Sequence, residues 1–139
     1  MFNHCPTPRP RLKALLVEDS PRMREILTES LENVPGLEVA GVAETVADAI
    51  AAFESHRPDI VILDLSLGVG SGLDVLREIK QRTPRCWVLI FTGHDQESYR
   101  QYCLGAGADF FFSKNRQHHE LIQQLHRLAS EAPNVAVEC

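Results

Sequence analysis

The stretch Ile60-Val-Ile-Leu-Asp64-Leu-Ser-Leu-Gly68-Val-Gly70-Ser-Gly72 is an apolar run that ends on a carboxylate and continues into small, glycine-rich residues. Residues 60–63 show no alternation, which is typical of a strand covered on both faces of a parallel sheet. Asp64 is therefore expected at the carboxyl end of a central strand, where open α/β sheets bind their ligands. A lone aspartate at such a place is also typical of an ordinary turn. Its role therefore depends on what the rest of the chain brings to the same edge.

Strand patterns alternate with helix patterns along the chain. The predicted strands occupy residues 12–17, 37–43, 60–63, 86–91 and 108–112, with the second expected near an edge of the sheet. The predicted helices occupy residues 21–34, 45–56, 72–82, 95–104 and 117–130. Ser20 before Pro21, and Thr45 three residues before Asp48, are expected to cap the first two helices. Because each crossover lays its helix back across the sheet, this order predicts an α/β fold with a parallel sheet covered on both faces.

The composition indicates one globular domain. The chain has 139 residues, of which 44% are hydrophobic and 24% charged, which suffices for one sizeable core. We assign residues 12–130 to this domain, 1–11 to a flexible N-terminal extension and 131–139 to a tail. The net charge of −5 and the scattered basic residues argue against direct nucleic-acid binding. No apolar run reaches membrane-spanning length and no hydrophobic signal core is present, so we expect a cytoplasmic protein that binds no membrane.

The cysteines and histidines do not suggest a metal or redox site. The four cysteines are far apart in the sequence and are expected to be free thiols in a reducing compartment. His118 and His119 are adjacent and would point about 100° apart on a helix, and His126 lies two turns beyond His119. A solvated helix face explains all three histidines.

Four of the five predicted strands end on a polar group that could do chemistry. These groups are Glu18-Asp19 after the first strand, Asp64 after the third, Thr92 after the fourth and Lys114 after the fifth. Each has an ordinary explanation as a cap, turn or surface charge. Parallel strands all end at one edge, however, so the topology brings three carboxylates, a hydroxyl and an ammonium together there.

This set of groups predicts a magnesium-assisted phosphoryl-transfer site. Crowded carboxylates repel one another unless a cation lies between them, and Mg²⁺ prefers oxygen ligands, often carboxylates together with phosphate oxygens. A carboxylate such as Asp64 can attack a phosphoryl group and form a mixed anhydride. Lys114 and Thr92 would then stabilise phosphoryl oxygens. Glycines after Asp64 would allow close approach of the backbone.

From Leu12 to about Ala129 the chain resembles the receiver domains of two-component response regulators. The resemblance rests on Leu-Val-Glu18-Asp19, Asp64, Gly72 eight residues later, Phe-Thr92-Gly93, and Phe111 three residues before Lys114. It implies a flavodoxin-like, doubly wound five-stranded parallel sheet in the order 2-1-3-4-5 with five helices. It also implies that Asp64 is the phosphoacceptor and that the donor is a histidine kinase or a histidine phosphotransfer protein.

The resemblance also implies roles for the other site residues. Asp19, Asp64 and the backbone carbonyl of Ser66 would contact Mg²⁺, and Glu18 would act largely through a bound water. Thr92 and Phe111 match the family's switch pair, which remodels the face formed by the fourth helix, fifth strand and fifth helix. Homodimerisation through that face is a further expectation.

The chain departs from the family pattern at three places. Asn115 stands where many members have proline after the lysine, Gly68 stands where many have proline in the loop after the acceptor, and Gly93 often has alanine as its counterpart. A cis peptide after Lys114 is therefore in doubt, the loop at Gly68 is expected to be more flexible, and the end of the switch strand roomier. None of the three removes a reactive group.

Three functional interpretations stay open at this point. The favoured one is a phosphoryl-accepting signalling switch that phosphorylates and dephosphorylates itself but turns over no external substrate. The second is a small phosphohydrolase with Asp64 as transient nucleophile, although Ser66 stands where such enzymes usually place a second acid. The third is a binding-only pseudo-receiver, which the filled reactive positions disfavour. Three residues are expected to flank the site: Ser66, Gly93 and His94. Of these, Ser66 and His94 are expected to set the lifetime of the phosphoryl group.

Overall fold

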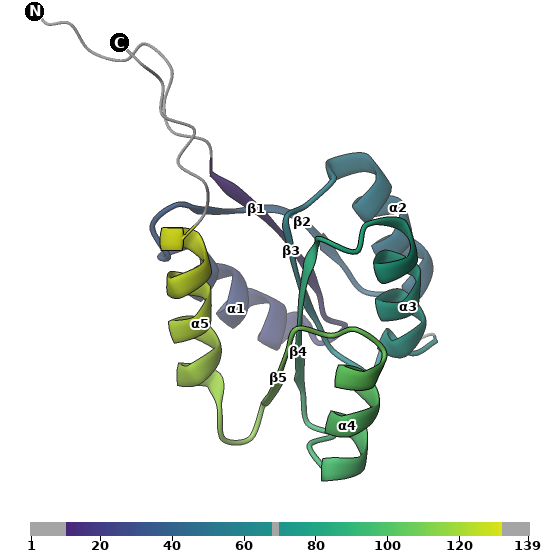
Figure 1. Cartoon of the computed structure of the whole chain (residues 1–139). Coiled ribbons are helices and arrows are strands. Elements are labelled where there is room, and N and C mark those ends of the chain that lie inside the picture. The colour runs from purple at the N-terminus through teal and green to yellow at the C-terminus, as the bar shows by residue number, and fades with distance from the viewer. Residues whose placement is uncertain (1–10, 68–69, 132–139) are drawn as a thin grey trace, which may run out of the picture.

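A computed structural model describes residues 11–67 and 70–131, and it shows a five-stranded parallel sheet in the order β2-β1-β3-β4-β5 (Figure 1). The strands are β1 (Leu12–Val17), β2 (Leu37–Ala43), β3 (Ile60–Leu63), β4 (Trp87–Thr92) and β5 (Phe110–Ser113). The helices are α1 (Pro21–Glu32), α2 (Val46–His56), α3 (Gly72–Arg82), α4 (Glu97–Gly105) and α5 (His118–Glu131). The fold class is confirmed, with β3 central and β2 at an edge. The expectations for residues 1–10, Gly68 and the segment after 131 lie outside the described residues.

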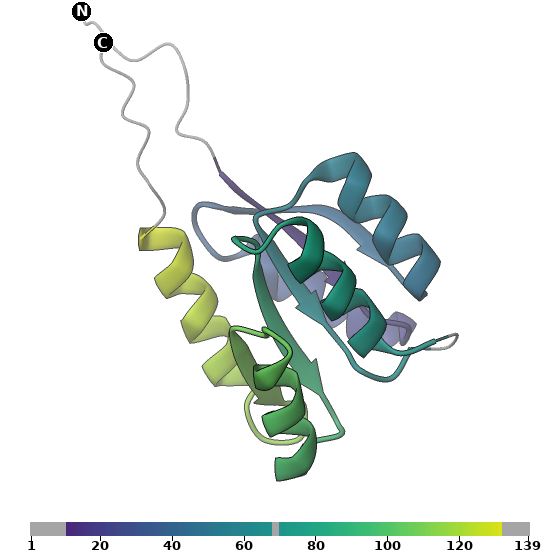
Figure 2. The same cartoon turned by 45° about the vertical axis from the view of Figure 1, so that its right-hand side comes forward.

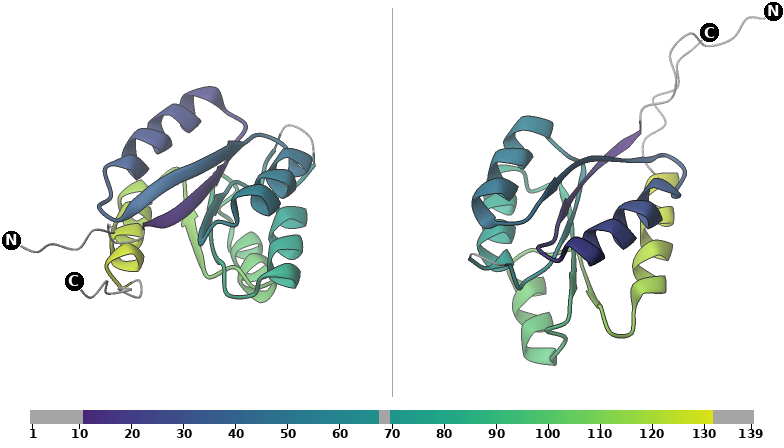
Figure 3. Two further views of the ribbon diagram at one scale, coloured as in Figure 1. Left: turned by 90° about the horizontal axis from the view of Figure 1, so that it is seen from above. Right: turned by 180° about the vertical axis from the view of Figure 1, so that it is seen from behind.

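The sheet separates two apolar clusters, because successive side chains of a strand point to opposite faces. Leu15 and Val17 of β1 pack with α2, α3 and α4, whereas Ala14 and Leu16 pack with α1 and α5. All four residues of β3 are buried and divide between the two clusters in the same way. Figure 3 shows α1 and α5 on one side of the sheet and the other three helices opposite. This double covering explains the unbroken apolar sequence of β3.

Helix starts follow the capping chemistry of the sequence. The Ser20 hydroxyl accepts a hydrogen bond from the Met23 amide, and Pro21 occupies the first turn of α1. The Thr45 hydroxyl accepts from the Asp48 amide at the start of α2. Both predicted N-caps are therefore confirmed, and each satisfies one of the amide groups that a helix start leaves unpaired.

Several element boundaries differ from the prediction by one to two residues, because side chains near the ends are used elsewhere. Strand β5 starts at Phe110 rather than residue 108, since the Asp109 carboxylate accepts from the Val88 amide and from Lys80 Nζ, both at 2.9 Å. Helix α4 starts at Glu97 rather than residue 95, since the Asp95 carboxylate accepts a hydrogen bond from Ser113 at the end of β5. Strand β4 is shifted by one residue, and α1 ends at Glu32.

The described helices include none that is long and apolar enough to cross a membrane. Within residues 11–67 and 70–131 there is also no cis peptide bond, so the bond between Lys114 and Asn115 is trans. The two cysteines in the described residues, Cys86 and Cys103, are both buried free thiols. Burial raises the pKa of the Cys86 thiol to about 12.

Candidate functional site

The strand ends bring the predicted site residues to one edge of the sheet. The strands run in the same direction (Figure 2), and the last residue of β3, Leu63, lies beside Val17 of β1 and Ile90 of β4. Backbone hydrogen bonds continue the pairing beyond the strands: the Asp64 amide donates to the Val17 carbonyl at 3.1 Å, and the Lys114 amide to the Thr92 carbonyl at 2.9 Å. Each functional residue is thus fixed by backbone bonds to its neighbouring strand.

Lys114 lies at the centre of the site. Its Nζ is 2.7 Å from Glu18 Oε1 and 2.8 Å from Asp64 Oδ2. Its side chain is 17% exposed, and those of the two carboxylates are 2% and 5% exposed. Burying these charges carries a desolvation cost, so the loss of one partner would leave an uncompensated charge in a site that little water reaches.

The protonation of these groups reflects burial and mutual contact. Burial raises the pKa of Glu18, although hydrogen bonds from Lys114 and from the Ser20 amide oppose that rise. Burial alone would lower the pKa of Lys114, but the hydrogen bonds to Asp64 and Glu18, together with the attraction of their negative charges, outweigh burial and raise it. The ammonium form of Lys114 is therefore held firmly between the two carboxylates.

The acidic residues form a donor set for a hard cation. One carboxylate oxygen from each of Glu18, Asp19 and Asp64 lies within 4.8 Å of the others. Three carboxylates opposed by one ammonium leave two formal negative charges. This set of oxygen donors with no histidine or cysteine fits Mg²⁺ and not a softer metal. The residues therefore fit the cation that the sequence predicts.

The glycines after β3 allow the loop to pass close to Asp64. A Cβ on Gly72 would overlap the Asp64 carbonyl oxygen and lie 2.9 Å from Leu65 Cα. The Gly72 amide donates to the Leu65 carbonyl at 2.9 Å, which closes the loop onto the strand end. Gly70 has φ +88°, a conformation that L-residues rarely adopt. The Ser66 amide donates to Asp64 Oδ1 at 3.3 Å, so this loop also orients the carboxylate.

The predicted switch residues lie next to this cluster. Thr92 is fully buried, and its hydroxyl oxygen accepts the His94 amide at 3.1 Å. Phe111 is half-buried and packs against the cluster on the α2–α4 face. Gly93 is exposed and has no atom within 4 Å of a Cβ built on it, which agrees with a roomy strand end. The exposed His94 ring lies 5.4 Å from the Tyr99 ring of α4.

Arg24, on α1, supports the acidic pair and was not found from the sequence. Its guanidinium donates to the carbonyl oxygens of Glu18 and Asp19, each at 3.1 Å, and lies 3.4 Å from Glu44 Oε1. It thereby joins the end of β1 to the segment after β2. The only signal for this role is its place one turn into a helix that follows the acidic pair.

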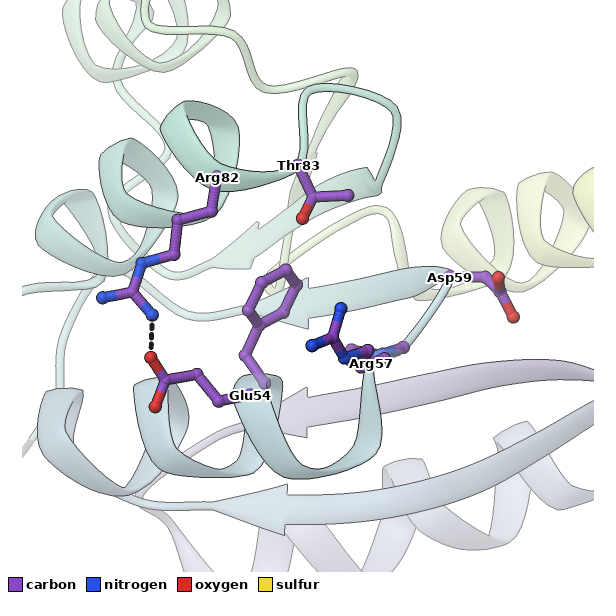
Figure 4. A pocket seen from close by; sticks show the side chains of 7 residues that line it. Glu54, Arg57, Asp59, Arg82 and Thr83 are labelled. Atoms are coloured by element: carbon purple, nitrogen blue, oxygen red, sulfur yellow. Dashed lines mark hydrogen bonds and ion pairs between the residues drawn. The ribbon is translucent and has the colours of Figure 1, made fainter.

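A separate pocket lies near the amino end of β3, between the C-terminal ends of α2 and α3 (Figure 4). Its volume is about 400 Å³, and its lining includes Phe53, Arg57 and Thr83 together with the ion pair between Arg82 and Glu54. None of the predicted site residues lines it. The pocket is therefore distinct from the carboxylate cluster.

Fold and cluster together define a doubly wound α/β domain with a cluster of three carboxylates, Asp64 among them, at the carboxyl ends of its strands. Residues 14–126 match the response regulator receiver domain family. The chain belongs to this family of phosphoryl-accepting domains of two-component signalling, as the resemblance implied.

Known proteins agree with this assignment. The chain is 30% identical to a nitrate/nitrite response regulator protein homolog of Haemophilus influenzae, over 86% of this chain and 57% of that protein. It is 31% identical to the chemotaxis protein CheY of Halobacterium salinarum, over 73% and 83% of the two chains. A solved two-component response regulator of the LuxR family from Aurantimonas sp. superposes with a TM-score of 0.80 at 29% identity, covering 86% of each chain. The chain spans about half the length of several curated relatives that it matches.

Proposed function

We propose that Asp64 accepts a phosphoryl group from the phosphohistidine of a histidine kinase or a histidine phosphotransfer protein. The observation that carries this proposal is the buried Asp64 carboxylate held 2.8 Å from Lys114 Nζ, with the oxygens of Glu18 and Asp19 within 4.8 Å. A carboxylate oxygen attacks phosphorus and forms the acyl phosphate. The bond from phosphorus to the donor imidazole breaks, and the imidazole nitrogen keeps the electron pair.

The neighbouring residues have separate tasks in this reaction. Glu18, Asp19, Asp64 and the Ser66 carbonyl are the groups that would hold Mg²⁺, which when bound neutralises charge on the transferring phosphoryl group. The ammonium group of Lys114 already lies beside Asp64, so it needs only to exchange its bond to a carboxylate oxygen for a bond to a phosphoryl oxygen. Because the Thr92 oxygen accepts the His94 amide, its hydroxyl proton is available for a second phosphoryl oxygen.

Labelling with a small phosphodonor tests this proposal. The protein is incubated with Mg²⁺ and acetyl phosphate, and its intact mass is followed over time beside an Asp64→Ala variant. We expect one acid-stable, base-labile phosphoryl group per chain, absent from the variant and lost without Mg²⁺. The decay of the label in Ser66→Ala and His94→Ala variants measures how these flanking residues set the lifetime.

The same assay separates the alternatives. Rapid multiple turnover of the donor would instead identify a phosphohydrolase with Asp64 as transient nucleophile. Absence of label with acetyl phosphate, phosphoramidate and a phosphohistidine donor would support a binding-only pseudo-receiver.

The proposed output is a rearrangement of the face formed by α4, β5 and α5. Helix α4 is short and buries only one residue, Cys103. Its two tyrosines, Tyr99 and Tyr102, are 39% and 47% exposed. A thinly packed helix of this kind can shift at small cost when Thr92 and Phe111 rearrange. We expect beryllofluoride, a phosphoryl mimic, to drive homodimerisation through this face. Sedimentation velocity with Mg²⁺, with and without beryllofluoride, measures it, and an unchanged mass would count against the dimer.

A further inference from the structure

Asp95 connects the loop after β4 to the end of β5 and the first residues beyond it. Its Oδ2 accepts a hydrogen bond from Ser113 Oγ at 2.7 Å and lies 3.4 Å from Asn115 Nδ2. Its place is three residues after Thr92, before α4 starts at Glu97. The loop after β4 is thus joined to the last residue of β5 by a charge-assisted bond, which is shorter and stronger than a bond between neutral groups.

Ser113 is the centre of this network. It is 1% exposed, and each of its polar groups has a partner. Besides donating to Asp95, its hydroxyl oxygen accepts the Asn115 amide at 3.1 Å. Its own amide donates to Gln117 Oε1 at 2.9 Å, and its carbonyl accepts the Gln117 amide at 2.8 Å. The backbone on both sides of residue 114 is therefore fixed by bonds that converge on one buried serine.

Lys114 stands between the two residues that this network holds. A lysine side chain has four rotatable bonds and loses considerable entropy when its ammonium is fixed. Because the network already fixes the backbone of Lys114, less conformational entropy has to be lost when the ammonium is held for phosphoryl transfer. The hydrogen bonds from Ser113 and then Asn115 lower the pKa of Asp95, which keeps this carboxylate charged at neutral pH.

We propose that Asp95, acting through Ser113, is a positioning residue that holds Lys114 in place for phosphoryl transfer at Asp64. The bond also makes Lys114 respond to the loop that follows Thr92, because that loop and the end of β5 cannot separate while the bond is intact. This inference rests on the proposed function, since the reaction at Asp64 is the one that Lys114 serves.

The test compares variants of Asp95 and Ser113 in the labelling reaction. Asp95→Ala should lower the maximal rate of labelling roughly tenfold, while the Mg²⁺ concentration for half-maximal rate stays unchanged, because no metal-binding group moves. Asp95→Asn should restore most of the rate, since an amide oxygen can still accept from Ser113 Oγ. Ser113→Ala should match Asp95→Ala, and the double variant should lose no more than either alone.

A second measurement needs no phosphodonor. Amide hydrogen exchange by NMR should show faster exchange at Asn115 and Gln117 in Asp95→Ala than in the unchanged chain. The matched control is Glu97→Ala, two residues after Asp95, which removes an exposed carboxylate that is paired with Arg100. This variant should change neither the labelling rate nor the exchange.

The outcomes separate the two proposals. An unchanged chain that takes no label would overturn the proposed function and this inference with it. Normal labelling of the unchanged chain together with an undiminished rate in Asp95→Ala would overturn the inference alone. A rate loss in Asp95→Ala that Asp95→Asn does not restore would also overturn it, because the hydrogen bond to Ser113 would then not be the cause.

Discussion

Replacing Lys114 with methionine is expected to destabilise the protein by about 3 kcal/mol at neutral pH without Mg²⁺. The substitution keeps much of the side-chain volume but removes the ammonium that lies 2.7 Å from Glu18 and 2.8 Å from Asp64. Both carboxylates are nearly fully buried and would remain as uncompensated charges. Urea unfolding of the variant beside the unchanged chain measures the loss.

The pH dependence of this loss follows from the pKa directions. The pKa of Lys114 is raised above its ordinary 10.5, so its contribution is complete below that value and disappears only as the pH rises through the higher folded-state pKa. The pKa of Glu18 is raised above 4.5 by burial, so the folded protein binds that proton more tightly than the unfolded chain. Without Lys114 this effect grows, and the variant should regain stability as the pH falls toward 4.5.

Mg²⁺ should stabilise the Lys114→Met variant more than the unchanged chain. A ligand that binds only the folded state stabilises it by RT ln(1 + [L]/Kd), so tighter binding gives more stabilisation at the same Mg²⁺ concentration. Without the Lys114 ammonium the site presents one more net negative charge to the cation, which should tighten binding. Lys13→Met is the matched control, because Lys13 Nζ contacts only a carbonyl oxygen, that of His56, at 3.4 Å. A variant as stable as this control would show that the carboxylates are not held against Lys114 as described.

Replacing Gly72 with alanine is expected to cost about 3 kcal/mol, at the upper end for an inserted methyl group. Alanine normally favours a helix over glycine by up to about 1 kcal/mol, but here its Cβ would overlap the Asp64 carbonyl oxygen and crowd Leu65 Cα. These are backbone atoms at the end of a buried strand, so they cannot rotate away as a flexible side chain could. The clash therefore outweighs the gain in helix propensity.

The same variant should label poorly with acetyl phosphate, because any relief of the clash moves Asp64. Gly93→Ala is the matched control, since a Cβ on Gly93 meets nothing within 4 Å, and its stability should change by less than about 0.5 kcal/mol. Thermal unfolding and the labelling assay on both variants measure the contrast. Equal melting temperatures for the two would contradict the close approach of the loop to the strand.

The sequence predicts the parts of the site that depend on strand order. Asp64 and Lys114 are far apart in the chain, but each follows an apolar strand, and parallel strands end at one edge. The sequence does not predict the bonds of Arg24 to the carbonyl groups of Glu18 and Asp19, or that of Asp95 to Ser113. These bonds join segments whose relative placement depends on the tertiary fold, and neither Arg24 nor Asp95 stands out by residue type or spacing.

Small errors at element ends have the same origin. The apolar neighbours of Asp109 predict a strand at this residue, but its carboxylate bonds to Lys80 and to the Val88 amide. Periodicity reports which residues are buried and does not report which polar side chains compete with the backbone at the ends. Such residues become visible only once their partners are placed.

The sheet also acts as a partition between two separately packed halves of the molecule. Leu27 on α1 and Val75 on α3 belong to different apolar clusters, with the strands between them. Changes on opposite faces share no side-chain contacts and should therefore combine additively, whereas changes within one cluster should not. The core between the sheet, α1 and α5 could thus be redesigned for greater stability without changing the packing of α4 and Phe111 on the other face.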